Sequence, residues 1–222
     1  MTNIQINIVV LGNFNPSILT HHFLVTECGL DLGQEQPKQQ QLPVLASISY
    51  DGISFFADLS RFQITEKNCA NPKQSKLPEY LDTYLEKLPY TPVTKCGTNL
   101  SYNAEIAQER LSSIEIQVAK NRENLCKSFQ VDNLELEAVF NVHPTNESIK
   151  RWILRTTPNA SDSKTTMTIS HKPDSNTITV DFNYEVNLEG DTGRIKNITD
   201  RYDTIYDLFL TQFKKLFGEE IS

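Results

Sequence analysis

The chain has 222 residues, of which 38% are hydrophobic and 22% are charged, and its formal net charge is −7. This composition excludes a disordered protein and is sufficient for one sizeable core or two small ones. The negative charge disfavours non-specific binding to nucleic acid or to an anionic membrane, because phosphate groups carry charge of the same sign.

The N-terminal stretch MTNIQINIVVLGNF has no basic segment, and its apolar run at residues 6–12 is too short for a signal peptide or a membrane span. We therefore expect a cytosolic protein that makes no membrane contact. Cys28, Cys69, Cys96 and Cys126 form no CxxC pair, so we expect reduced thiols and no zinc site.

The first third of the chain begins with a predicted buried strand at residues 4–11, followed by the turn GNFNP. A short helix is predicted at about 20–28, with Thr20 as its N-cap and Gly29 as its C-terminal stop. The Gln-rich stretch GQEQPKQQQLP, residues 33–43, shows no periodicity and is predicted to be a surface loop.

Asp51-Gly52 lies between two β-rich segments and predicts a hairpin with a type I′ turn, joining strands at roughly 44–50 and 53–65. The apolar phase changes near Ser60 within the second strand. We interpret this change as a bulge or a bend.

The middle of the chain predicts a helix at residues 77–88, with Leu81, Leu85 and Leu88 as its apolar stripe. Pro89 ends this helix, and a strand at about 91–105 follows. Residues 108–129 favour another helix, although their β-branched residues leave a strand open as an alternative.

The last third is predicted to be mostly β, with an amphipathic helix at the end that Thr199 or Asp200 can cap. The residues expected to face the core from this helix are Ile205, Leu208, Phe209, Gln212, Phe213 and Leu216. The predicted strands are residues 133–142, 148–156, 165–171 and 177–188.

These elements predict an α+β fold, a mostly antiparallel sheet covered by three or four helices. The segments around Asp58 and Asp181 share a pattern, and each is followed some distance later by an amphipathic helix. Two interpretations of the domain organisation remain open. The chain is a single domain over 1–222, or that domain contains two copies of a hairpin-then-helix unit in halves of about 1–105 and 106–222.

His21-His22, with Glu27 and Cys28 farther along the same predicted helix, is the first candidate for a metal or nucleophilic site. Adjacent side chains on a helix point about 100° apart, so the two histidines do not face one ion, and no HExxH motif completes a site. A solvated helix start is the favoured interpretation, and we expect no metal or cofactor.

Asp58 and Asp181, together with Glu135 and Glu137, supply carboxylates for a metal-dependent hydrolase or nuclease with a dispersed site. No adjacent D/E-x-K triplet completes such a site. Aspartates that face solvent from strands are the simpler explanation, and the enzyme remains an alternative.

The strand IKRWILR is basic and carries the single tryptophan of the chain. If Lys150 and Trp152 lie on an open sheet face, Trp152 can stack on a base of RNA or single-stranded DNA while Lys150 binds phosphate. A tryptophan buried beneath a helix is the favoured alternative.

The segments LGNFNPSILT, FLVTECGL and LPYTPVTKCGTNLSY resemble those of a loosely defined family of uncharacterised, sporadically distributed bacterial proteins. The resemblance implies a bacterial protein, often encoded near mobile elements or defence genes, with no enzymatic residues to carry over. The matching residues are Asn13, Phe14, Asn15, Pro16, Tyr90, Pro92, Gly97 and Asn99.

These observations together predict a non-catalytic protein-binding subunit of a bacterial multi-protein system, defence-related systems included. The strand-rich fold offers sheet edges to which a partner chain can add a strand. The expected partner is another protein chain or a second copy in a homodimer, and nucleic acid is an unlikely partner.

Overall fold

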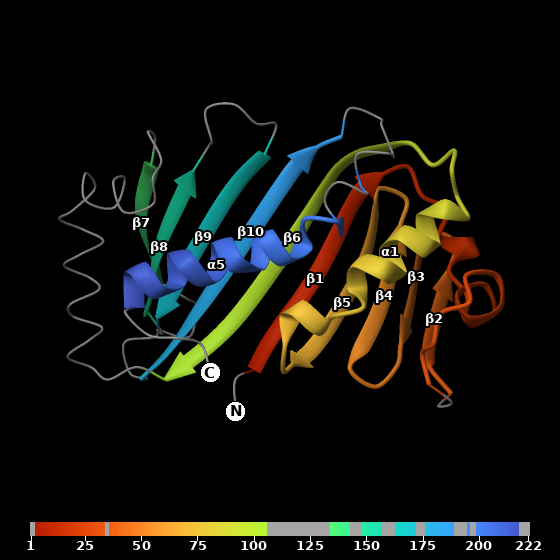
Figure 1. Cartoon of the computed structure of the whole chain (residues 1–222), viewed down its shortest axis with the longest axis horizontal. Helices are drawn as coiled ribbons and strands as arrows, with labels where there is room; N and C mark the ends of the chain where they lie inside the picture. Colours follow the sequence, from red (N-terminus) through yellow and green to blue (C-terminus); the bar gives the residue numbers. More distant parts are fainter. Residues whose placement is uncertain are drawn as a thin grey trace.

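The computed structural model describes residues 3–33, 36–105, 134–142, 148–156, 163–171, 176–188, 195 and 199–217. Within them, ten strands form one sheet in the order β2-β3-β4-β5-β1-β6-β10-β9-β8-β7 (Figure 1). All neighbouring strands are antiparallel, as predicted. The strands are β1 (Asn3–Gly12), β2 (Lys38–Leu42), β3 (Leu45–Ser49), β4 (Ile53–Asp58), β5 (Arg61–Cys69), β6 (Val93–Glu105), β7 (Leu134–Val142), β8 (Ser148–Thr156), β9 (Ser163–His171) and β10 (Thr177–Asn187).

The strand order repeats about the middle of the sheet. β1 pairs with β6 on one side and, on the other, with β5, the last strand of the run from β2 to β5. β6 pairs in the same way with β10, the last strand of the run from β7 to β10. The two units of this repeat are β1 to β5 and β6 to β10, so β6 belongs with the second half of the chain. In the repeat, β4 with Asp58 corresponds to β9, whereas Asp181 lies on β10. The arrangement of two hairpin-then-helix copies remains a prediction.

Two α-helices, α1 (Leu77–Glu86) and α5 (Tyr202–Phe217), cross the same face of the sheet (Figure 1). The predicted cover of three or four helices is wrong for the residues described, which otherwise contain only the short helical turns η1 (Pro16–Ile18), η2 (Phe23–Glu27) and η3 (Pro72–Gln74). The helix predicted at 108–129 lies outside the described residues. Neither α1 nor α5 has the length and apolarity that a membrane-spanning helix needs.

The helix predicted at 20–28 is a single π-type turn, although both of its predicted end signals are present. Thr20 Oγ1 accepts the Phe23 N–H at 3.1 Å, and Gly29 has a φ of +68°. So short a segment satisfies few of its own backbone groups, and it packs on the sheet beside α1, where Phe23 meets the ring of Tyr84 edge-on at 5.7 Å.

The predicted loop at 33–43 contains a strand, and the predicted strand at 53–65 is two strands. β2 adds to the sheet by pairing with β3, which requires backbone groups and no apolar side chains. The chain between β4 and β5 turns at Leu59-Ser60, so the phase change near Ser60 marks a hairpin rather than a bulge. The Asp51-Gly52 hairpin is confirmed, but only Gly52 has a positive φ, so its turn is not type I′.

The core lies between the sheet and the two helices. In the N-terminal half, Tyr84 of α1 stacks on Phe62 of β5 with ring centroids 3.9 Å apart. In the C-terminal half, Phe209 of α5 packs on Phe182 of β10 at 5.6 Å. Each helix therefore buries aromatic rings against one half of the sheet, and the opposite side of the sheet, called the open face below, has no helix among the described residues.

Candidate functional site

The centre of the open face is a ladder of polar side chains that hydrogen-bond to one another. Asn99 Nδ2 donates to Asn7 Oδ1 at 2.7 Å, and Asn183 Nδ2 donates to Asn99 Oδ1. On the next row, Ser101 Oγ donates to Asp181 Oδ1 at 2.6 Å. These hydrogen bonds link β1, β6 and β10 across the centre of the open face.

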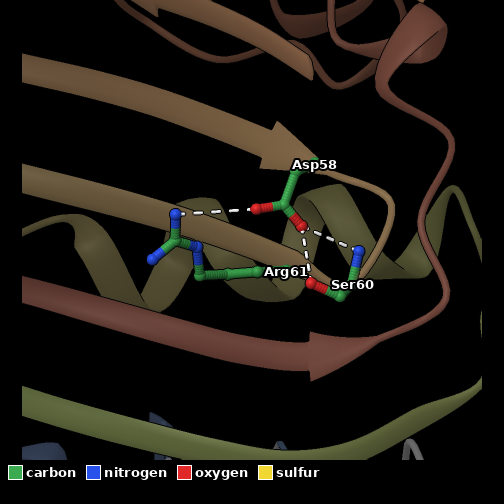
Figure 2. Close-up of polar contacts among 3 residues, drawn as sticks. All are labelled: Asp58, Ser60 and Arg61. Atoms are coloured by element: carbon green, nitrogen blue, oxygen red, sulfur yellow. Dashed lines mark hydrogen bonds and ion pairs between the residues drawn. The ribbon is translucent and has the colours of Figure 1, made fainter. Parts of the chain in front are cut away.

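The β4–β5 turn is organised by Asp58 (Figure 2). Asp58 Oδ1 accepts the Ser60 N–H at 2.7 Å and the Ser60 hydroxyl at 2.8 Å, while Oδ2 lies 3.6 Å from Arg61 Nη2. Burial raises the pKa of the Asp58 carboxyl, but the hydrogen bonds from Ser60 and the charge of Arg61 outweigh burial and leave the pKa below its usual value. The carboxylate is therefore a turn-forming group held in its charged state.

Arg61 is fixed beside this turn with little of its hydrogen-bonding capacity used. Its guanidinium carbon lies 4.7 Å from the ring centroid of Phe56, a cation–π contact on the open face. The 3.6 Å separation from Asp58 is too long for a hydrogen bond. Arg61 Nε is buried and has no acceptor among the described residues.

Exposed apolar side chains gather at the same end of the sheet. Leu59 in the β4–β5 turn is 54% exposed, Val44 in the β2–β3 turn is 55% exposed, and Leu11 near the end of β1 is 37% exposed. Leu45 pairs with Asp58, which brings the two turns together, and Leu11 pairs with Arg61. We call Leu11, Val44, Phe56, Leu59 and Arg61 the rim patch.

The sequence interpretation missed the rim patch. The signal for it is a leucine in a turn, because turns favour small polar residues and a side chain at Leu59 is difficult to bury there. Recognising that signal requires knowing that Leu59 lies in a turn, and the continuous apolar pattern of the segment hid the turn.

Asp58 and Asp181 do not form the dispersed hydrolase site considered above. They lie on β4 and β10, four strand positions apart, which corresponds to roughly 19 Å across the sheet. Asp58 is engaged by the turn and Asp181 by Ser101. Within the described ranges, no three His, Cys, Asp or Glu side chains converge in a way that could hold a metal ion.

The residues of the His21-His22 candidate are also kept apart. His21 Nδ1 shares a 2.8 Å hydrogen bond with the Tyr50 hydroxyl, whereas His22 Nε2 lies 3.9 Å from Glu27. Burial raises the pKa of Cys28 to about 11, which keeps its thiol protonated and unreactive near neutral pH.

Lys150 and Trp152 lie on β8, and their side chains are outside what the structure describes, as are those of Glu135 and Glu137. The register pairs Trp152 with Ile169 and Lys150 with His171. Ile169 and His171 are both buried on β9. A nucleic-acid contact at Lys150 and Trp152 remains a prediction.

Comparison with known proteins gives no family. No protein-family model and no curated protein matches the sequence. The chain is similar, at 10% identity and a TM-score of 0.32, to the solved structure of a rolling circle replication initiator protein from Geobacillus stearothermophilus, over 94% of this chain and 80% of that one.

Proposed function

We propose that this chain is a non-catalytic, cytosolic protein-binding subunit of a bacterial multi-protein system, and that it binds its partner through the rim patch. The observation that carries the proposal is the concentration of exposed apolar side chains beside a fixed arginine. Exposed apolar patches mark interaction surfaces, and arginine and aromatic residues are enriched in protein interfaces.

The edge of the sheet next to the rim patch supports the same function. β2 is an edge strand whose five residues are all exposed. Alternate residues of an edge strand direct their N–H and C=O groups away from the sheet, where an extended segment of a partner can pair with them. A partner seated on the rim patch can therefore extend along β2 without moving any part of the sheet.

The test is affinity purification of the tagged chain from its own host with quantitative mass spectrometry, comparing wild type with Leu59→Asp and Val25→Asp. Val25 of η2 is 37% exposed and outside the rim patch, so it is the matched control. We expect a stoichiometric partner with wild type and Val25→Asp, and at least tenfold less with Leu59→Asp.

Size-exclusion chromatography with light scattering then distinguishes a different partner from a second copy. A dimer of the purified chain that Leu59→Asp dissociates would mean that the partner is the chain itself. A monomer with no recovered partner, or a partner that Leu59→Asp binds as well as wild type does, would refute the proposal.

A further inference from the structure

Arg61 has hydrogen-bonding capacity that the described residues leave unused, because the Asp58 carboxylate pairs with it only at 3.6 Å. Its ring contact with Phe56 and its position above β5 fix the guanidinium, and 41% of the side chain is exposed. Arg61 Nε is buried, so a partner can reach only the Nη groups. The exposed Nη groups can donate to a carboxylate with the fork geometry that arginine favours.

The surroundings of Arg61 favour one carboxylate between apolar side chains. Leu11 lies next to Arg61 on β1, and Leu59 lies in the turn beside it. Both leucines are exposed and can pack on aliphatic residues that flank the acidic residue of a partner. This packing excludes water and strengthens the ion pair between that acidic residue and Arg61.

A polyphosphate fits this surface poorly. The next cation on the row, Lys95, is neutralised by Glu185 at 2.9 Å, and Asp58 and Asp181 add negative charge to the same face. A single carboxylate at the Nη groups of Arg61 meets one of these charges, that of Asp58, which lies 3.6 Å from Nη2, whereas a run of phosphates also lies against Glu185.

We propose that Arg61 binds an aspartate or glutamate of the partner protein, and that Leu11 and Leu59 bind the aliphatic residues on either side of it. This inference rests on the proposed function and adds the chemistry of the partner segment. The recognised segment is an extended stretch of chain in which an acidic residue lies between two aliphatic residues.

The test is a titration of the ¹⁵N-labelled full chain, followed by NMR, with the capped peptide Ala-Leu-Asp-Leu-Ala and its Asn counterpart. We expect saturable shifts of the Leu11, Leu59 and Arg61 amides and of the Arg61 Nε–H with the Asp peptide. Binding should be at least tenfold weaker with the Asn peptide or with Arg61→Gln. Arg201→Gln, which removes an exposed arginine outside the rim patch, is the matched control and should bind like wild type.

Equal binding of the two peptides, unchanged binding by Arg61→Gln, or no saturable shift would overturn the assignment of Arg61. Stronger shifts of the same amides with oligothymidylate would overturn it in favour of nucleic acid. A recovered partner that Leu59→Asp loses and Arg61→Gln keeps would refute this inference and leave the proposed function standing. Retention of the partner by Leu59→Asp would refute the proposed function itself.

Discussion

Replacing Gly12 by alanine should destabilise the protein, because the end of β1 leaves no space for a side chain. A Cβ added at Gly12 would lie 2.2 Å from the carbonyl oxygen of Pro92, and an ordinary contact requires about 1.2 Å more. The same carbonyl accepts the Asn13 N–H at 2.9 Å, and the Gly12 N–H donates to Ser60 at 2.9 Å, so moving the backbone weakens both hydrogen bonds. Overpacking costs about 1–3 kcal/mol and each hydrogen bond about 1 kcal/mol. We expect a loss of about 2–4 kcal/mol.

Gly97→Ala is the matched control, because Gly97 also lies in a central strand. A Cβ there would meet its nearest atoms at 3.5 Å, an ordinary contact, and the alanine restricts the unfolded chain. Gly97→Ala should therefore be neutral or stabilising by up to about 1 kcal/mol. Urea unfolding followed by circular dichroism measures the free energy of unfolding of both variants, and thermal unfolding should show a fall of about 4–16 °C in Tm for Gly12→Ala. If Gly12→Ala proves as stable as Gly97→Ala, the steric argument is wrong.

Three further predictions follow from individual contacts. The folded-state pKa of Asp58 is lowered, so its contribution to stability is present above its unfolded pKa of about 4 and is lost as the pH falls through the folded value. Asp58→Asn keeps the turn acceptor, and its stability should fall less than that of wild type when urea unfolding is repeated between pH 5 and pH 2. Burial raises the pKa of Cys69 and of Cys96 to about 12, so alkylation at pH 8, mapped by mass spectrometry, should be at least tenfold slower for both in the folded protein than in guanidinium. Thr199 Oγ1 lies 3.0 and 2.9 Å from the two carboxylate oxygens of Asp82 on α1, so Thr199→Val should cost about 1–3 kcal/mol by urea unfolding, and no change would mean that this contact does not stabilise the fold.

The sequence predicted the elements that bury a periodic apolar surface. The final helix is an example. Of its predicted inward residues whose side chains the structure describes, Leu208 is partly buried and four are buried, namely Ile205, Phe209, Gln212 and Phe213. Tyr80 and Tyr84 of α1 are buried as well, although the predicted apolar stripe contained only leucines. A tyrosine has an apolar ring and a polar hydroxyl, so its burial depends on the partner it finds, which for Tyr84 is Phe62 on another strand.

The elements that the sequence concealed are those specified by polar groups. β2 has the sequence KQQQL and joins the sheet through its backbone, so no apolar alternation marks it. The β4–β5 turn contains no glycine, proline or asparagine, and it depends on Asp58 accepting two hydrogen bonds from Ser60. The rim patch was hidden with that turn, because Leu59 and Arg61 look like two members of one long strand until the hairpin is known.

Within the residues that the structure describes, the repeated strand order carries one rim patch, and this sets the expected stoichiometry. β4 and β5 correspond in the repeat to β9 and β10, and the described ends of those strands are His171 at the end of β9 and Thr177 at the start of β10. His171 is buried and Thr177 carries no charge, so neither reproduces the arginine that we propose as the anchor. We therefore expect one partner molecule per chain, measured as the mass of the purified complex by light scattering. A complex with two partner molecules on one chain would mean that binding follows the topological repeat and not the side chains of the rim patch.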